Sequence, residues 1–361
     1  NEAEFDASML EQKTRSRAAS EMSTDDWTIL VEGNTESFVG YDQVENEVKI
    51  TRYRKIDSKK DGVLYQIVLD TTPFYPEGGG QVGDKGILTP NLSKGEGAIE
   101  IIDTKKENNL ILHFAKKLPE NVNSSFIAKV NQDLRSLTSK NHSATHLMHL
   151  ALRNILGKHV EQKGSFVNHK HLRFDFSHFS KTSDDEIAAV TAIVNQKIRE
   201  NIPVVIKEMH KDDAIKLGAM ALFGEKYGDK VRVVVMDPAY SIELCGGTHV
   251  GHTGEIGAFI LKAEASVAAG VRRIEAVVGE AAAKHITEVN EKLHKQIVQL
   301  TEACAVLALK TTAPFKAPEW DENSSVAVLN DTIASLQSSQ KELSKKLESK
   351  EALLVNELTT Q

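Results

Sequence analysis

Cysteine, aromatic residues and long apolar runs are all scarce in this chain of 361 residues. Two cysteines, Cys245 and Cys304, are too few for a disulfide framework at this length, so we expect a reducing, cytoplasmic setting. No run of about 18 apolar residues is present, which argues against a membrane-spanning helix or a membrane partner. Apolar residues make up 40% of the chain and aromatic residues only 6%, so two or three domains with aliphatic cores are expected.

A secretion signal is also missing, because residues 1–11 are acidic and polar. The chain begins with Asn rather than Met, so we expect a piece of a longer protein. The net charge of −7 argues weakly against a nucleic-acid partner. Residues 131–180, however, hold seven basic and three acidic residues, a local charge of +4. This basic middle is compatible with a phosphate-binding face and equally with a solvated surface.

The hydrophobic pattern divides the chain into four parts and predicts an α+β fold. Residues 1–25 contain an amphipathic linking helix over 2–22, and residues 26–132 alternate in short stretches, typical of a small β-barrel-like subdomain. Residues 133–279 mix helices with buried strands in an α+β core. The helices are expected over 137–156, 183–201 and 211–220, the second beginning with a Ser183 and Glu186 capping box.

Residues 280–361 form the fourth part, in which apolar residues recur every three or four positions in two stretches. A loop containing Pro314 and Pro318 separates the stretches. The pattern predicts two long helices in an antiparallel hairpin, or a seam for a partner chain. Simple packing of these helices on the rest of the protein is a third interpretation.

The sharpest local motif is a pair of histidines, His142 and His146, in the predicted helix 137–156. Residues four apart share one face of a helix, so both imidazoles can reach one metal ion. Cys245 and His249 are separated by the sequence Gly-Gly-Thr, in which the glycines permit a tight turn. Together the four side chains form a nitrogen and sulfur set suited to tetrahedral Zn²⁺. His149 and His252 are spare candidates, interpreted as solvated or supporting residues.

A glycine-rich stretch covers residues 72–84 and includes three consecutive glycines, Gly78, Gly79 and Gly80, followed by Gln81. Consecutive glycines let the backbone approach a ligand closely and offer it several N–H groups. The stretch lacks the Gly-Lys-Ser/Thr of a phosphate-binding P-loop and the spacing of a dinucleotide fingerprint. Taken by itself, it fits a ligand loop or an ordinary turn.

These motifs, with residues 172–178 and 270–276, resemble the editing domain of alanyl-tRNA synthetases in order and spacing. The resemblance covers residues 27–279, and the flanking helices are similar to neighbouring parts of the same family. It implies an ester hydrolase that removes serine or glycine from mischarged tRNA(Ala), with Zn²⁺ bound by His142, His146, Cys245 and His249. Aminoacylation motifs are absent, so we do not expect the chain to charge tRNA.

The resemblance also implies roles for individual side chains in recognising the substrate. Gln162 matches a glutamine of the editing pocket, and Thr72 matches a threonine that recognises the serine hydroxyl. The acceptor end of tRNA(Ala) is expected to contact eight further residues. Four belong to the glycine-rich stretch, Gly78, Gly79, Gly80 and Gln81, and four are basic side chains, Lys163, Arg173, Arg272 and Arg273. Each basic side chain also fits an ordinary surface ion pair.

Three other interpretations of the motifs stay open. A free-standing editing protein shares the histidine and cysteine pairs and the glycine loop. A non-catalytic tRNA-binding module would hold a purely structural zinc in a closed site. A thiol hydrolase would use Cys245 as nucleophile and His249 as base, although no third residue is evident to orient that base. Whether the zinc activates water or only orients the substrate also stays open, and self-association through the last helices is expected.

Overall fold

The computed structural model describes residues 23–32, 37–58, 61–90, 97–220, 228–321, 324 and 326–359. The helix predicted over residues 2–22 lies outside this range. The chain divides into two compact units, residues up to Gly279 and residues from Glu280 onward. Within the described part, no helix combines the length and the hydropathy needed to cross a membrane.

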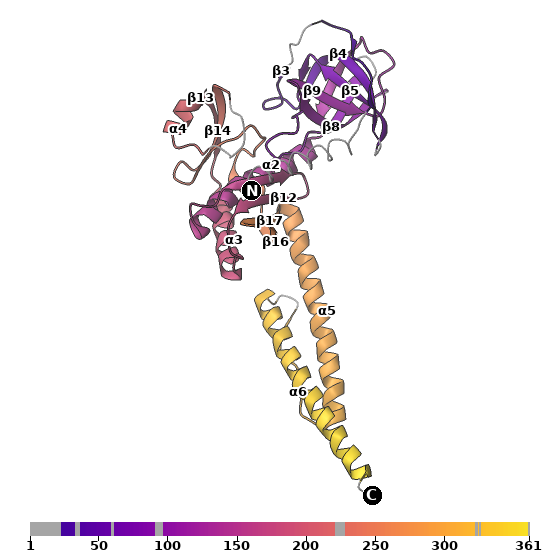
Figure 1. Cartoon of the computed structure of the whole chain (residues 1–361), viewed down its shortest axis with the longest axis vertical. Helices are drawn as coiled ribbons and strands as arrows, with labels where there is room; N and C mark the ends of the chain where they lie inside the picture. The colour runs from indigo at the N-terminus through magenta and orange to yellow at the C-terminus, as the bar shows by residue number, and fades with distance from the viewer. Residues whose placement is uncertain are drawn as a thin grey trace, which may run out of the picture. The chain divides into compact units, whose positions relative to one another are not determined.

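The first large element is an eight-stranded antiparallel sheet, drawn in indigo to purple in Figure 1. Its order is β1-β4-β10-β7-β8-β9-β5, with β2 beside β4, and β4 also pairs with β5. The strands are β1 (Ser23–Thr24), β2 (Thr28–Ile29), β4 (Glu45–Ser58), β5 (Gly62–Leu69), β7 (Gly86–Pro90), β8 (Ile99–Glu107), β9 (Leu110–Ala115) and β10 (Ser125–Val130). The β-rich character predicted for this part is confirmed, while its finer description as a barrel-like subdomain stays a prediction.

Alternating side chains build the core of this sheet. Ile67, Leu88 and Phe126 come from three different strands and are fully buried in one cluster. The turn from β8 to β9 contains Asn108 and Asn109, both at positive φ, as a tight two-residue hairpin requires. A short parallel pair, β3 (Ser37–Phe38) and β6 (Thr71–Thr72), leads into the glycine-rich stretch.

The second half of this unit is centred on the helix α2 (Gln132–Leu156). Asn131 caps its N-terminus by accepting a hydrogen bond from the Leu134 backbone N–H, and Gly157, at φ 116°, ends it. The helix packs with α3 (Asp184–Arg199) on a four-stranded antiparallel sheet. The sheet has the order β11 (Gln162–Val167), β12 (Leu172–Ser177), β17 (Val271–Val278) and β16 (Phe259–Ala268).

Aliphatic and phenylalanine side chains from both helices and the sheet fill this second core. Leu147 of α2, Val190 of α3 and Phe174 of β12 are fully buried in a single cluster. The predicted capping box of α3 is present, with Ser183 and Glu186 bonded reciprocally. These contacts fix the face of α2 that carries His142 and His146.

A three-stranded sheet completes the first unit, with β13 (Val204–His210), β14 (Lys230–Met236) and β15 (Ser241–Leu244) in that order. The helix α4 (Lys211–Lys216) follows β13 and is shorter than the predicted 211–220. It ends early because Gly218, at φ 88°, takes a left-handed conformation. A one-turn 3-10 helix, Thr253–Ile256, lies between β15 and β16.

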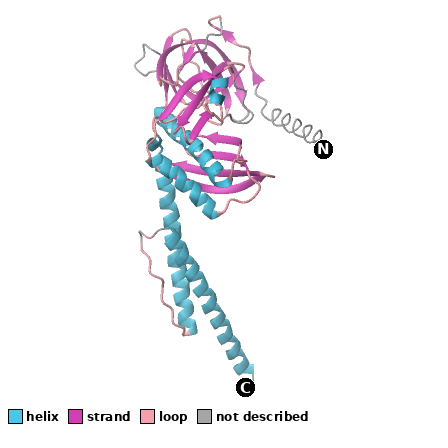
Figure 2. Cartoon of the chain, turned by 90° about the vertical axis from the view of Figure 1, so that its left-hand side faces the viewer, coloured by secondary structure: helices cyan, strands magenta, loops and turns pink. Residues whose placement is uncertain are grey.

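The second unit consists of α5 (Gly279–Thr311) and α6 (Val326–Thr359), which confirms the predicted helical region. The antiparallel arrangement was wrong, because the contacts advance in the same direction along both helices. Cys304 Sγ lies 3.4 Å from the Leu336 carbonyl oxygen, and Lys350 Nζ donates to the Lys310 carbonyl at 3.0 Å. The Trp320 ring lies 5.1 Å from the His294 ring, so the chain turns back along α5 before α6 begins (Figure 2).

Candidate metal centre and the cavity beside it

Four side chains from two distant stretches meet in the first unit. His142 and His146 project from α2, and Cys245 and His249 follow β15. One potential ligand atom from each lies within 4.8 Å of all the others. Cys245 Sγ is 3.5 Å from His142 Nε2 and 3.3 Å from His249 Nε2. A tetrahedral zinc ion separates its ligand atoms by about 3.3–3.8 Å, so the cluster has dimensions that suit such an ion.

The outward nitrogen of each imidazole in this cluster has a protein partner. His142 Nδ1 lies 2.8 Å from Gln81 Oε1, His146 Nδ1 lies 3.1 Å from Glu243 Oε2, and His249 Nδ1 lies 3.2 Å from Ser143 Oγ. An amide oxygen and a carboxylate only accept, so the two α2 histidines carry their protons on Nδ1 when neutral. Their Nε2 lone pairs are therefore free for a metal, as in many zinc sites.

An unpaired buried atom supports the same conclusion. His146 Nε2 is buried and has no hydrogen-bond partner among the described residues. Burying an imidazole nitrogen unpaired is costly, and a metal ion in the cluster would satisfy it. The donor set of three imidazoles and one thiol also fits zinc chemically. We conclude that the residues present fit a bound zinc ion.

Charges within the cluster shift the pKa values of its members. Burial alone would raise the pKa of the Cys245 thiol, but the imidazoles of His142, His249 and His146 lower it well below its usual range. Burial alone would lower the pKa of His146, but the carboxylate of Glu243 and the sulfur of Cys245 raise it to about 10. The cluster therefore stabilises the thiolate, which is the form that binds metals.

The glycine-rich loop supports the cluster through Gln81. Besides contacting His142, Gln81 Oε1 accepts from the Thr248 backbone N–H at 2.9 Å, and Gln81 Nε2 donates to Thr248 Oγ1 at 3.0 Å. Gly80, at φ 83°, passes so close to Ser165 that a β-carbon would collide with it. The loop is docked on β11 by hydrogen bonds to Val167. Gln81, predicted as a tRNA contact, is thus a buried support of the metal centre.

Arg135 joins this loop to the first turn of α2, and charge counting along the sequence does not reveal it. Its guanidinium is buried and forms an ion pair with Asp84, with Nε 2.9 Å from Oδ1. The other nitrogens donate to the carbonyl oxygens of Gly40 at 2.7 Å and Pro73 at 2.9 Å. A basic residue two helical turns ahead of a ligand histidine was the only signal available in the sequence.

A small cavity adjoins the metal centre, with room of about 10 Å³ for the centre of a water molecule. It is lined by Gly79, His142, Thr145, His146, His149, Gln162, Ser165, Phe174 and Glu243. The predicted pocket residue Gln162 is therefore beside the cluster, as is Gly79. Thr145, Ser165 and Glu243 were not predicted as site residues. Only Thr145 had a local signal, because it lies on the same face of α2 as the ligand pair, whereas Ser165 and Glu243 belong to strands β11 and β15.

Thr72 lies elsewhere and is not among the residues that line this cavity. Its hydroxyl is 2.7 Å from His113 Nε2 and accepts from the Phe74 backbone N–H at 3.1 Å. His113 Nδ1 is 3.0 Å from the Ile67 carbonyl oxygen, and burial lowers the pKa of His113 to about 4. The imidazole is therefore neutral near pH 7, and Thr72 helps to fix the entry of the glycine-rich loop.

Three of the four basic side chains predicted to contact tRNA are paired with acidic ones. Arg272 forms a two-pronged ion pair with Glu264, and Arg273 Nε lies 2.6 Å from Asp175 Oδ1. Lys163 Nζ donates to Glu161 at 3.0 Å. The guanidinium of Arg173 stacks over the Phe166 ring at 5.5 Å. A phosphate would have to share or displace these carboxylates at three of the four positions.

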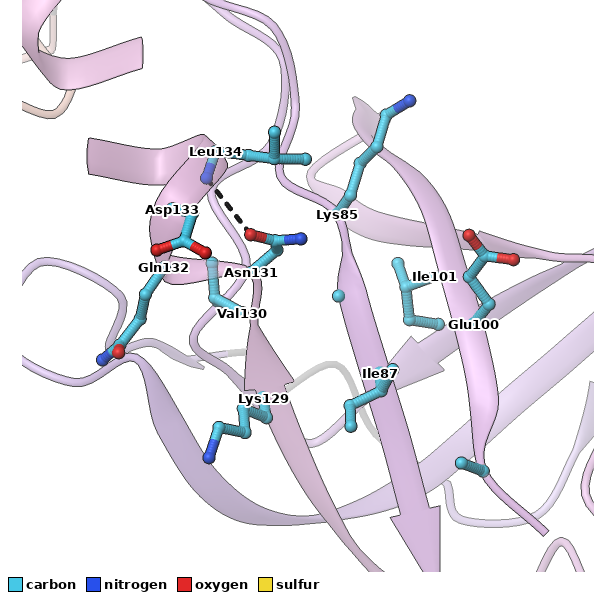
Figure 3. A pocket seen from close by; sticks show the side chains of 12 residues that line it. Lys85, Ile87, Glu100, Ile101, Lys129, Val130, Asn131, Gln132, Asp133 and Leu134 are labelled. Carbon is cyan, nitrogen blue, oxygen red and sulfur yellow. Dashed lines mark hydrogen bonds between the residues drawn. The ribbon is translucent and has the colours of Figure 1, made fainter. Parts of the chain in front are cut away.

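A second, larger cavity of about 650 Å³ lies between β7, β8, β10 and the start of α2 (Figure 3). Its charged lining residues are of both signs: Lys85, Lys129, Glu100 and Asp133. The dashed line in Figure 3 marks the capping hydrogen bond from the Leu134 N–H to Asn131 Oδ1, 3.1 Å long. None of the predicted site residues lines this cavity, and its charge balance favours no particular ligand.

Comparison with known proteins agrees with these features at two places in the chain. Residues 1–134 match a family model described as class II (A) tRNA synthetases. Residues 231–275, which include Cys245 and His249, match the second additional domain of threonyl and alanyl tRNA synthetases. The chain is thus similar to class II tRNA synthetases over residues 1–134 and to their editing-associated domain over residues 231–275.

Curated relatives narrow this class further. The chain is 61% identical over 287 residues to an alanine–tRNA ligase of Flavobacterium psychrophilum, an alignment that covers 78% of this chain and 32% of the relative. Similar enzymes of Christiangramia forsetii and Cytophaga hutchinsonii are 53% and 52% identical, covering 80% and 82% of this chain and 33% of each relative. The chain belongs to the alanyl-tRNA synthetase family. It spans about a third of the length of the relatives it matches.

Proposed function

We propose that this chain is an aminoacyl-tRNA deacylase that hydrolyses the ester of tRNA(Ala) mischarged with serine or glycine. The observation that carries the proposal is the cluster of His142, His146, Cys245 and His249 beside a polar cavity. Membership of the alanyl-tRNA synthetase family supplies the substrate class. The chain lacks the aminoacylation motifs, so ligase activity is not part of the proposal.

The ester of an aminoacyl-tRNA is already activated, so hydrolysis needs little more than an oriented carbonyl and a positioned water. A zinc ion held by His142, His146, Cys245 and His249 would supply Lewis-acid chemistry at the ester carbonyl. The protein's own contribution is positional. Gln81, Glu243 and Ser143 orient the three imidazoles, and Gln162 lines the space next to them.

The tRNA end is proposed to approach over the glycine-rich loop, where Gly78, Gly79 and Gly80 offer close access to the backbone. Lys163 and Arg173 belong to β11 and β12, next to the cavity wall formed by Gln162 and Phe174. Arg272 and Arg273 belong to β17, which pairs with β12. Each could bind a tRNA phosphate only while it also contacts its carboxylate partner, Glu264 or Asp175. Thr72 would affect the site only indirectly, by fixing the glycine-rich loop. The residues that line the cavity would therefore recognise the amino acid.

Deacylation and metal content, measured on the same protein samples, test the proposal. The purified chain is expected to hold about one zinc per molecule and to hydrolyse Ser-tRNA(Ala) and Gly-tRNA(Ala) faster than Ala-tRNA(Ala). His142→Ala and Cys245→Ala should lose zinc and at least about 100-fold in rate. Cys304→Ala is the matched control, because Cys304 is buried in the helical unit.

The same measurements separate the alternatives. Tight tRNA binding with full zinc content and no hydrolysis would favour a structural zinc in a binding module. Activity that survives chelation but is lost on alkylation in the Cys304→Ala background would favour Cys245 as a nucleophile, with His249 Nε2 3.3 Å away as its base. Equal deacylation rates for the wild type, His142→Ala and Cys245→Ala would refute the proposed active site.

A further inference from the structure

His149 is a buried histidine of α2 that the proposed metal set does not use. It is 3% exposed, and its ring packs against Phe174 with 5.2 Å between ring centroids. His149 Nδ1 lies 3.3 Å from Glu243 Oε2, the same carboxylate oxygen that contacts His146. Because a carboxylate accepts hydrogen bonds, Nδ1 of the neutral imidazole carries the proton. Nε2 is therefore left as a hydrogen-bond acceptor.

The buried position of this acceptor favours the binding of a hydrogen-bond donor. His149 Nε2 is buried and has no hydrogen-bond partner among the described residues, although the ring lines the cavity beside the metal centre. An unpaired buried acceptor is unfavourable, so a small donor that enters the cavity is favoured. The space available, about 10 Å³, is the room of roughly one water molecule.

We propose that His149 recognises the amino-acid side chain of the substrate. Its Nε2 atom would accept a hydrogen bond from the seryl hydroxyl. The proposal rests on the deacylase function above and adds a specificity-determining residue to it. The hydroxyl is about the size of a water molecule, so it can replace a water on Nε2 and reproduce its hydrogen bond. Glu243 acts as a positioning residue, because it fixes the tautomer of His149.

The same geometry distinguishes alanine from glycine as well as from serine. A glycyl group has no side chain, so a water can stay on His149 Nε2. An alanyl methyl group fills the space of that water but cannot donate, and it leaves the acceptor unpaired. A site built to hydrogen-bond a hydroxyl rejects an analogue without it more strongly than a size filter does. One acceptor and one water-sized space thus admit serine and glycine and disfavour alanine.

The α-ammonium group is the other donor that the substrate offers, and the Glu243 carboxylate in the cavity lining is an acceptor of matching charge. The ammonium group is shared by all three amino acids, so its recognition cannot separate them. The two assignments therefore predict different kinetics.

Deacylation of Ser-, Gly- and Ala-tRNA(Ala) by the full chain tests this inference. In His149→Phe, a ring without an acceptor, we expect the ratio of the seryl to the alanyl kcat/KM to fall about tenfold or more. His149→Gln keeps an acceptor and should recover part of the ratio. His159→Phe, which replaces an exposed histidine, is the matched control. Zinc content should equal that of the wild type in all three variants.

A second readout does not depend on any variant being active. The imidazole ¹⁵N resonance of His149 Nε2, identified by its loss in His149→Gln, should shift when a 3′-serylamido adenosine analogue binds to the wild type. The alanyl analogue should bind more weakly and should not produce that shift. This experiment supports or overturns the role of His149 even if His149→Phe fails to fold.

The possible failures are distinguishable. A wild type that hydrolyses none of the three substrates refutes the deacylase function itself. A wild type that hydrolyses them, with an unchanged seryl-to-alanyl ratio in His149→Phe, refutes the inference about His149 alone. Equal losses for all three substrates indicate contact with the ammonium group or a structural role, and they overturn it too.

Discussion

At the residue scale, the orientation of imidazoles decides what this site can do. Gln81 and Glu243 hold the Nδ1 atoms of His142 and His146, so that both Nε2 atoms face Cys245. Burial alone would raise the pKa of Glu243, but His146 and His149 lower it, and the carboxylate stays ionised between them. Metal-binding histidines generally depend on such partners. The chemistry of the proposed centre therefore extends beyond its four ligands.

Gly247 offers a test at this scale, because its α-carbon lies directly against the His142 ring. A β-carbon there would collide with His142 Cε1 and Nδ1 and with Gln81 Oε1. We expect Gly247→Ala to displace the imidazole and to lower zinc affinity about 10–100-fold. Competition with a chromogenic chelator measures the affinity.

The neighbouring glycine provides the control for this prediction. A β-carbon at Gly246 would meet only Tyr41 Oη, 3.8 Å away, which is an ordinary contact distance. Gly246→Ala should therefore bind zinc as the wild type does. Unchanged affinity in both variants would show that the cluster tolerates a shift of His142, contrary to our description of the site.

At the element scale, α2 and the glycine-rich loop act as one framework. The helix supplies His142, His146 and the cavity residues Thr145 and His149 from a single face. The loop supplies Gln81, and Arg135 at the start of the helix ties the two together. The sheet that carries Gln162 and Phe174 closes the cavity from the other side. Displacement of the loop should therefore disturb the metal centre.

The buried ion pair of Arg135 and Asp84 allows the contribution of this framework to stability to be tested. Lysine keeps the charge but cannot reproduce the fork of donors to Asp84, Gly40 and Pro73. Because buried carbonyl oxygens left without a donor cost about 1–3 kcal/mol each, Arg135→Lys should lower the free energy of unfolding by at least about 2 kcal/mol. Urea unfolding monitored by Trp27 fluorescence reports on the first unit. The chain has two tryptophans, so the other one, Trp320, is replaced by Phe to leave Trp27 as the only tryptophan signal.

An exposed ion pair in the same unit is the control. Lys129 Nζ lies 2.9 Å from Glu45 Oε2, and both side chains are about half exposed. Lys129→Ala should cost less than about 1 kcal/mol. Equal losses for the two variants would mean that the Arg135 contacts do not anchor the loop.

At the scale of the whole molecule, the two units differ in how far their apolar side chains are buried. The first unit encloses its own cores, whereas the last turns of α6 present apolar side chains to solvent. Lys350 contacts the Lys310 carbonyl near the end of α5, so the residues of α6 that follow extend past that helix. Leu353 is 64% exposed and Leu354 is 50% exposed. Such a row favours a partner helix, and we propose self-association through this end of the chain.

Sedimentation velocity tests the self-association. The wild type is expected to form a concentration-dependent dimer, and the double substitution Leu353→Glu with Leu354→Glu should shift it to a monomer. Gln337→Glu with Ser338→Glu adds the same charge at exposed positions elsewhere on α6 and should leave the dimer intact. A monomeric wild type at all concentrations would rule the proposal out.

Local features of this protein could be predicted from the sequence, because they depend on residues a few positions apart. The helix that carries His142 and His146, the capping box at Ser183 and the helical end of the chain all followed from short-range spacing. The family resemblance followed from motifs of the same kind. Helical periodicity and hydrogen-bonding chemistry are properties of short segments, which is why these predictions held.

The contacts between groups distant in sequence could not be predicted in this way. Gln81 and His142 are joined across 61 positions, and Arg135 and Asp84 across 51, and no local pattern encodes either contact. The parallel course of α5 and α6 likewise depends on where the connecting segment turns, because the heptad pattern is the same for either direction. Thr72 turned toward His113 rather than the cavity for the same reason. Long-range packing selects one of several locally equivalent arrangements, so these features became visible only in three dimensions.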